Sequence, residues 1–81
     1  MEYDTDKVDE AVLALLYLGL HDVNKYGGRA WKGFDWEAMN RLHERGLIGD
    51  PRSKAKSVVM DAAGMAAAER AFEKLFGKGA G

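Results

Sequence analysis

The sequence predicts a small, mostly helical α+β domain in the order helix, loop, helix, short β-hairpin, helix. Three observations lead to this class. Apolar residues recur at helical spacing near both ends of the 81-residue chain, a middle helical segment stops at a glycine, and a basic turn precedes a valine-rich run. The length fits one domain. We expect it to span residues 1–76, with a disordered tail at 77–81.

The composition excludes several classes of protein. The chain has no cysteine, which rules out disulfide frameworks and thiolate zinc sites and agrees with a cytoplasmic location. The first ten residues are acidic where a signal peptide would be basic. The apolar run at 11–20 is shorter than the roughly 20 residues of a membrane span. We therefore expect a cytoplasmic protein that makes no contact with a membrane.

The charge is unevenly distributed along the chain. The formal net charge of −1 argues against a general binder of polyanions. Residues 1–24 carry a net charge of −5, residues 25–56 carry +4, and the remainder is balanced. The middle third is thus either a basic binding surface or an ordinary solvated one, and the sequence leaves both open.

The first predicted helix begins after Thr5 or Asp6, whose side-chain oxygens can cap free amides of the first turn. Its apolar residues cover more than one stripe, so the helix is expected to be buried on more than one side. The second cover is either another copy of the chain or, in a monomer, the terminal helices themselves. We predict a homodimer, with an interface formed by Val12, Leu13, Leu16, Leu20 and Phe72.

The segment between the first two helices is the least regular. Adjacent glycines at 27 and 28 predict a loop, in which "RAWK" forms at most a short extended piece and no full helix. The second helix begins after Asp35, a good N-cap. Its core face is expected to hold Trp36, Met39 and Leu42, with Ala38 as a small neighbour.

The stretch "RLHERGLIGDP" predicts a helix end followed by a chain reversal. Gly46 fits the left-handed position past the last turn, and Leu47 falls where it can pack back on Leu42. We expect residues 47–48 and 57–60 to form a short antiparallel hairpin, with turn chemistry at residues 49–51 and residues 52–56 near its tip. Asp61 then caps a last helix at 62–76, whose apolar stripe contains Met65, Ala68, Phe72, Leu75 and Phe76.

Two resemblances follow from these motifs. The segment "RLHERGLIGDPRSKAKSVVMDAAGMAAAERAF" resembles the C-terminal half of MarR-type winged-helix regulators, in which a recognition helix ends in Leu-x-x-x-Gly-Leu-Ile before a wing and a further helix. Leu42, Gly46, Leu47 and Ile48 match the first element. Nearly the whole chain resembles a small bacterial family of unknown function through "DTDKVDEAVLALLYLGLHD", "RAWKGFDWEAMNRLHERGLIGDP" and "KAKSVVM".

The winged-helix resemblance implies that residues 1–76 form a winged-helix-like domain with a DNA-binding surface. A regulator of that class carries a second helix that braces the recognition helix on DNA, whereas only residues 23–34 are available for it here. Basic and amide side chains suit contacts with phosphates and base edges. The candidate nucleic-acid-binding residues are Asn40, Arg41, Arg45, Arg52, Lys54 and Lys56.

The tryptophans and histidines of the chain are most simply explained by structural roles. Trp31 and Trp36 are expected in the core, although aromatic residues beside cations also stack on bases or anchor protein partners. His21 and His43 lack the spacing of a helical zinc motif and are better explained by helix C-termini. We therefore expect no catalytic residues, metal or cofactor. The sequence predicts a non-enzymatic, homodimeric module for protein interaction, or alternatively a regulator that binds duplex DNA.

Overall fold

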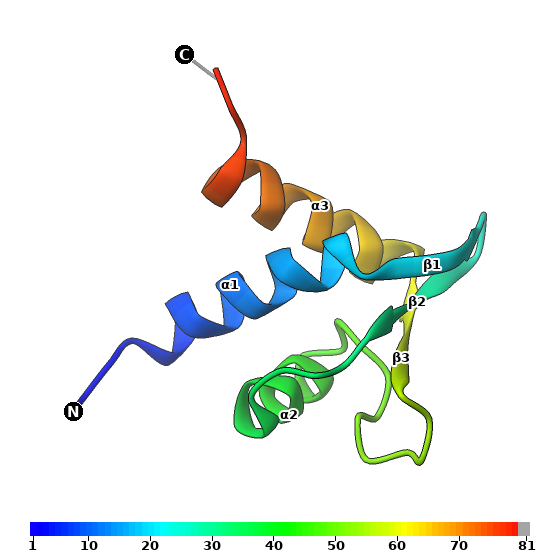
Figure 1. Ribbon diagram of the computed structural model, residues 1–81, viewed down its shortest axis with the longest axis horizontal. Helices are drawn as coiled ribbons and strands as arrows, with labels where there is room; N and C mark the ends of the chain where they lie inside the picture. Colours follow the sequence, from blue (N-terminus) through cyan, green and yellow to red (C-terminus); the bar gives the residue numbers. More distant parts are fainter. Residues whose placement is uncertain (80–81) are drawn as a thin grey trace.

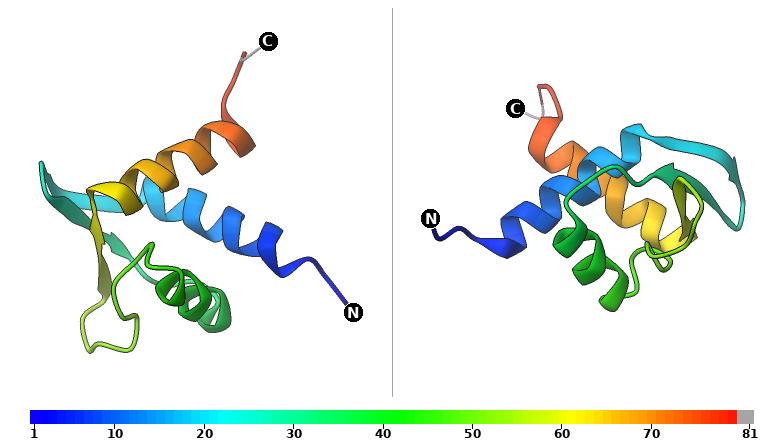
Figure 2. Two further views of the ribbon diagram at one scale, coloured as in Figure 1. Left: turned by 180° about the vertical axis from the view of Figure 1, so that it is seen from behind. Right: turned by 60° about the horizontal axis from the view of Figure 1, so that its bottom comes forward.

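The computed structural model describes residues 1–79 and contains three helices and one antiparallel sheet (Figure 1). The elements follow the order α1 (Thr5–Leu18), β1 (Leu20–Asn24), β2 (Gly27–Trp31), α2 (Trp36–Glu44), β3 (Ser57–Asp61) and α3 (Ala62–Phe76). The α+β class predicted from the sequence is confirmed. Helices α1 and α3 converge toward the sheet and diverge toward the two chain ends (Figures 1 and 2).

Helix α1 begins one residue earlier than a Thr5 cap implies and two residues earlier than an Asp6 cap implies. The N-cap is Asp4, whose carboxylate accepts hydrogen bonds from the amides of Asp6 at 3.0 Å and Lys7 at 3.2 Å. Its backbone is extended, as an N-cap requires. The prediction of Thr5 or Asp6 was wrong because three potential caps follow one another, and only the backbone conformation distinguishes them.

The contact between α1 and α3 is the most extensive in the molecule. Small side chains lie on both helices in the core, where Ala14 and Ala68 are fully buried and Ala71 is nearly so. Side chains of this size let two helix backbones approach closely. Val12, Leu13 and Leu16 of α1 extend the same core toward α2 and the sheet, and α2 also packs against α1.

A β-hairpin occupies the segment that was predicted as a loop. Strands β1 and β2 pair with Leu20 opposite Ala30 and His21 opposite Arg29, and the register then shifts before Asn24. Asp22 lies at this irregularity with φ of 52°, a left-handed conformation that Asp tolerates better than most residues. The expected absence of a helix in this segment is confirmed, and the extended "RAW" piece belongs to β2.

The predicted hairpin between residues 47–48 and 57–60 was wrong. Strand β3 pairs instead with β2 along its whole length, from Gly27 opposite Asp61 to Trp31 opposite Ser57. Leu47 and Ile48 lie outside any strand, and a single bond from the Gly49 amide to the Val59 carbonyl, 2.7 Å long, links them to β3.

Glycine explains why β2 is the better partner of β3. A Cβ atom at Gly27 would lie 2.2 Å from the carbonyl oxygen of Met60, and the residue adopts φ of 157°. Only glycine permits this close approach of the two backbones. The glycines that indicate a loop in the sequence are therefore the residues that allow the sheet to form.

Helix α2 has the predicted termini. The Asp35 carboxylate accepts from the Ala38 amide at 3.1 Å. At the other end Gly46 is left-handed with φ of 76°, and the amides of Gly46 and Leu47 donate to the carbonyls of His43 and Leu42. These two bonds define a Schellman motif, which confirms the helix stop and the chain reversal.

The predicted core face of α2 is correct except for one residue. Ala38, Met39 and Leu42 are fully buried, whereas the Trp36 side chain is about half exposed, at 49%. Trp36 is the first residue of the helix. A side chain there has no preceding helical turn beside it, so spacing alone could not place it in the core.

Helix α3 also begins and ends as predicted. The Asp61 carboxylate accepts from the Gly64 amide at 2.7 Å, and the helix ends at Phe76. In the predicted stripe Ala68 is buried and Met65 and Phe72 are half buried, whereas Leu75 and Phe76 are exposed. Of the predicted tail, residues 77–79 are exposed and non-helical, and residues 80–81 lie outside the described part.

The inner face of the sheet completes the core. Ala30, Val58 and Met60 point to one side of β2 and β3 and are almost completely buried. The helices that contact these strands are α1 and α3. None of the three described helices has the length and hydropathy that a membrane span requires.

Candidate functional site

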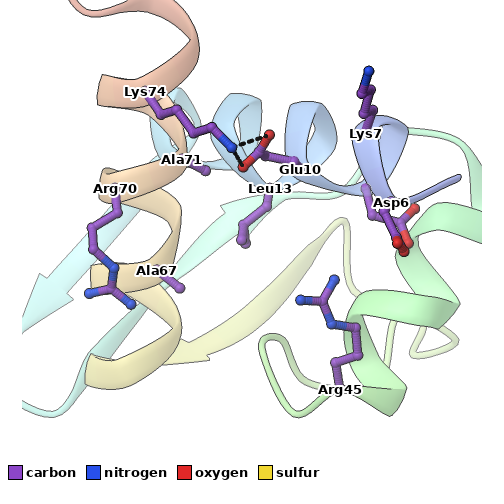
Figure 3. A pocket seen from close by; sticks show the side chains of 10 residues that line it. Asp6, Lys7, Glu10, Leu13, Arg45, Ala67, Arg70, Ala71 and Lys74 are labelled. Atoms are coloured by element: carbon purple, nitrogen blue, oxygen red, sulfur yellow. Dashed lines mark hydrogen bonds and ion pairs between the residues drawn. The ribbon is translucent and has the colours of Figure 1, made fainter. Parts of the chain in front are cut away.

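A groove of about 570 Å³ lies between α1, α3 and the end of α2, and Figure 3 shows it from close by. We call it the charged groove. Leu13 of α1 and Ala67 and Ala71 of α3 provide its apolar surface. Its other lining residues are charged: Asp6, Lys7, Asp9, Glu10, Arg45, Arg70 and Lys74.

Asp9, a lining residue of the charged groove, forms an ion pair with Arg41 of α2. The guanidinium of Arg41 donates two hydrogen bonds of 2.7 Å to the two carboxylate oxygens of Asp9. Asp9 is only 1% exposed, whereas the Arg41 side chain is 30% exposed. The Asp9 carboxylate raises the pKa of Arg41 further above its usual value. The pair joins α1 to α2 in a fixed orientation, because bidentate bonds constrain both distance and angle.

A second ion pair connects the other two helices. The Lys74 ammonium lies 3.0 and 3.3 Å from the carboxylate oxygens of Glu10, so it bridges α3 and α1 at the rim of the charged groove (Figure 3). Both partners are partly exposed, and pairs of this kind stabilise a fold only weakly. This pair neutralises one acid and one base of the lining.

Two arginines of the charged groove have no such partner. Arg45 caps the C-terminus of α2 and Arg70 lies on α3, and neither makes an ion pair or side-chain hydrogen bond with another residue in 1–79. Figure 3 shows their guanidinium groups extending from different elements on opposite sides of Leu13 and Ala67. Once Asp9 and Glu10 are paired, the charged lining residues that remain are Asp6, Lys7, Arg45 and Arg70, whose formal charges sum to +2.

The predicted nucleic-acid-binding residues are distributed over several surfaces. Arg41 is held by Asp9, and Arg45 lines the charged groove. Asn40 and Arg52 line a separate depression beside His43 and Glu44. Lys54 and Lys56 are exposed in the loop before β3. The structure thus keeps Arg52, Lys54 and Lys56 in one loop but directs the arginines of α2 elsewhere.

The loop that carries Arg52, Lys54 and Lys56 is anchored by Lys32. The Lys32 ammonium donates to the carbonyl oxygens of Pro51 at 2.7 Å and Ser53 at 2.6 Å. Within the loop, the amide and guanidinium of Arg52 donate to the Asp50 carboxylate, and these bonds lower the pKa of Asp50 below its ordinary value. Arg52 is therefore already paired, whereas Lys54 and Lys56 project freely from an anchored loop.

The residues predicted for a dimer interface lie mostly inside the chain. Val12 and Leu13 are nearly buried and Leu16 is fully buried by the chain's own helices and sheet, while Leu20 and Phe72 are half buried. The exposed apolar residues of α1 are instead Leu15 and Leu18. A second copy of the chain would have to contact these outer residues, because the inner ones already have neighbours.

Trp31 and His21 lie on the outer side of the sheet, opposite the buried Ala30. The expectation that Trp31 lies in the core was wrong: its side chain is 55% exposed and its ring stacks on that of His21, with centroids 4.2 Å apart. His21 belongs to β1, so a helix C-terminus does not account for it. His43 does lie in the last turn of α2, where its Nδ1 is 3.1 Å from the Ile48 carbonyl.

Neither histidine joins a set of metal ligands. Among the described residues, no group of three or more His, Cys, Asp or Glu side chains is arranged to hold a metal ion. The His21 Nδ1 lies 3.3 Å from the Asp22 carboxylate. One carboxylate and one imidazole are fewer ligands than a zinc or magnesium site uses.

Sequence reasoning missed the charged groove, although one signal was present. Asp9 occupies the same helical stripe as Val12, Leu13 and Leu16, at spacings of three, four and seven residues. A carboxylate on an apolar stripe requires a buried cation as partner. The signal does not identify that cation, because Arg41 is 32 residues away along the chain.

The fold and the charged groove define this protein as a small α+β domain with a candidate site between its helices. The chain belongs to the family described as Domain of unknown function (DUF6429), whose model matches residues 4–78. It is also 54% identical over 76 residues to the uncharacterized protein y4hR of Sinorhizobium fredii, covering 94% of this chain and 97% of that protein. No solved structure matches the chain. The predicted membership of a small family of unknown function is confirmed.

Proposed function

We propose that the protein is a non-enzymatic binding module that acts as a homodimeric protein-interaction or accessory domain. The observation that carries this proposal is the charged groove, in which two unpaired arginines border an apolar surface. Interfaces between proteins combine these two features, with arginine enriched among the residues that dominate binding energy. The ligand that fits best is a segment of a partner protein with acidic and apolar side chains.

The placement of the two arginines supports a peptide rather than a small anion. Arg45 and Arg70 extend from α2 and α3 on opposite sides of Leu13 (Figure 3). A carboxylate on each of two side chains could bond one guanidinium each, in the bidentate geometry that arginine favours. The apolar residues of the partner would then lie over Leu13, Ala67 and Ala71.

Affinity capture with crosslinking in the protein's native cells tests this function. The double variant Arg45→Glu and Arg70→Glu is expected to lose at least one partner that the unmodified protein captures, because opposite charges become like charges. The variant Lys25→Glu and Lys78→Glu changes the net charge equally at exposed positions outside the groove and is expected to retain that partner. Capture of the same proteins by all three chains would contradict a role for the charged groove.

A DNA-binding regulator is the second candidate, and one observation favours it. Lys54 and Lys56 project from the loop that Lys32 anchors, in the position that a wing has in the winged-helix resemblance. Two other features of the molecule argue against the insertion of α2 into the major groove of DNA. Arg41 is engaged by Asp9, and a β-hairpin at 20–31 takes the place of the bracing helix.

The salt dependence of binding tests this second function. If the loop contacts duplex DNA, the affinity for a dye-labelled duplex falls linearly with salt on logarithmic axes. The variant Lys54→Ala and Lys56→Ala is then expected to reduce the slope by about 2. Fluorescence anisotropy measures both quantities. The absence of binding by micromolar protein at low salt would reject the DNA-binding alternative.

A further inference from the structure

The outward side of α1 is apolar although the fold leaves it uncovered. Ala11, Leu15 and Leu18 are spaced by four and three residues, so they share one stripe of the helix. Leu18 is 66% exposed and Leu15 is 36% exposed. The inward stripe, with Val12, Leu13 and Leu16, already packs in the hydrophobic core. A surface helix of a monomer normally carries polar residues on its outward side.

Helix α3 carries further apolar residues beside α1. Phe72 packs on Tyr17 of α1 with ring centroids 5.3 Å apart, and Phe76 packs on Phe72 at the same distance. Phe76 is 51% exposed. We call the surface formed by Ala11, Leu15, Leu18, Phe72 and Phe76 the outer helical face. The contact between Tyr17 and Phe72 connects the last turn of α1 to the second half of α3.

The accessible surface of the chain is large for its size. It measures 5574 Å², whereas a compact monomer of this length exposes about 4,800 Å². The molecule is also flat, with extents of 37 × 35 × 18 Å. The exposed chain ends account for part of the excess. The remaining excess is therefore smaller than the roughly 800 Å² that one side of a standard protein interface covers.

Charged residues of both signs flank the outer helical face. Lys7 lies four residues before Ala11 on the same stripe of α1, and in Figure 3 its ammonium points away from Arg45 and Arg70. On α3, Glu69 and Glu73 each precede a phenylalanine of the face by three residues. None of these three charged residues makes an ion pair with another residue in 1–79.

We infer that the outer helical face binds a second copy of this chain in a two-fold symmetric dimer, which specifies the homodimer of the proposed function and rests on it. In such a dimer the same patch of both copies is in contact. Lys7 of each copy then lies near the acidic side of α3 in the other, because opposite charges on one patch are matched when the patch faces itself. Leu18 and Phe76 lie near the centre of the contact.

Sedimentation equilibrium of three chains tests this inference. The unmodified protein is expected to be a dimer at micromolar concentration. The variant Leu15→Lys and Leu18→Lys is expected to raise the dissociation constant at least about 100-fold, because it places two charges in an apolar contact. The control Trp36→Lys replaces a comparably exposed aromatic residue outside this face and is expected to remain a dimer. Circular dichroism establishes that each variant is folded.

The possible results separate the inference from the function on which it rests. If the Leu15→Lys and Leu18→Lys variant stays dimeric while Trp36→Lys dissociates, the inference about the outer helical face is wrong. The protein is then still a homodimer, with its interface elsewhere. A dimer that survives both variants would also overturn this face. An unmodified protein that stays monomeric at millimolar concentration would overturn the homodimer as well, while the affinity-capture experiment on Arg45 and Arg70 would be unaffected.

A spin-label measurement covers the case in which the lysine variant does not fold. The chain has no cysteine, so Leu18→Cys and, as a control, Lys54→Cys each introduce a unique labelling site. Pulsed electron resonance is expected to give a shorter distance between the two copies for the label at 18 than for the label at 54. An equal or longer distance at 18 would overturn the inference.

Discussion

At the scale of single residues, the pair of Asp9 and Arg41 is the feature with the largest structural consequence. Burying a carboxylate is costly unless a cation and good geometry compensate it. Here both oxygens of Asp9 receive a bond of 2.7 Å from the same guanidinium. The pair therefore matters most for the orientation of α2 on α1, since an apolar replacement of similar volume can stabilise a core as well or better.

Replacement of Arg41 by Met is expected to lower the melting temperature by roughly 10 °C or more, because the buried carboxylate of Asp9 loses its partner. The double variant Asp9→Leu and Arg41→Met is expected to recover most of this loss. Calorimetry measures the three transitions. Arg52→Met removes an exposed pair with Asp50 and serves as control, with an expected change within about 2 °C. Equal melting temperatures for the two Arg variants would contradict a structural role of Asp9.

Some of these residue-level features could be predicted and others could not. The caps Asp35 and Asp61 were predicted correctly because a cap acts on amides two or three residues away. Asp4 was missed because its neighbours Thr5 and Asp6 are equally suitable by type. The partner of Asp9 could not be predicted, since any of several lysines and arginines in the middle third of the chain could pair with a buried carboxylate.

At the scale of elements, the approach of α3 to the end of α2 depends on one glycine. A Cβ atom at Gly64, in the first turn of α3, would lie 2.3 Å from the carbonyl oxygen of Leu47. The Schellman motif at Gly46 directs the chain into this position. The helix stop and the start of α3 are therefore coupled, although 17 residues separate Leu47 from Gly64.

The variant Gly64→Ala is expected to destabilise the fold by about 1–3 kcal/mol, because the added methyl group forces the Leu47 backbone away from α3. Urea unfolding measures this change. Gly33→Ala is the matched control, since a Cβ atom there would meet no atom within 4 Å, and it is expected to be neutral or slightly stabilising. A Gly64→Ala protein as stable as the control would contradict the close approach.

Strand pairing was the main feature that element-level reasoning predicted incorrectly. The helices were predicted from periodicity, which is a local property of the chain. The hairpin at 47–60 was proposed because its two segments are close in sequence, yet β3 pairs with β2, about 30 residues away. Gly27 permits that pairing through its own lack of a Cβ atom. Gly27 is visible in the sequence, but its close contact with the Met60 backbone exists only after the sheet has formed.

At the scale of the whole molecule, a thin shape and exposed apolar side chains connect stability with association. The chain is 18 Å thick along its shortest extent, and residues such as Leu18 and Phe76 are largely exposed. A partner that binds only the folded state stabilises that state in proportion to the logarithm of its concentration. If that partner is a second copy of the chain, the free energy of unfolding depends on the protein's own concentration.

The melting temperature of the unmodified protein is thus expected to rise as its concentration increases from micromolar to millimolar. The variant Leu15→Lys and Leu18→Lys is expected to lose this dependence, because it removes association without touching the core. Leu16→Asp is expected to unfold the chain at every concentration, since Leu16 is fully buried. A melting temperature of the unmodified protein that does not vary with concentration would contradict the dimer.

The sequence by itself determined the α+β class, the extents of the two later helices and the helix stop at Gly46. These features depend on periodicity, caps and a left-handed glycine, all of which act within a few residues. The tertiary structure alone decided the β1–β2–β3 order, the partner of Asp9, the separation of Arg45 from the basic loop, and which side of α1 remains exposed. Each of these depends on contacts between distant segments, and several residues of the right chemistry compete for such contacts until the chain is folded.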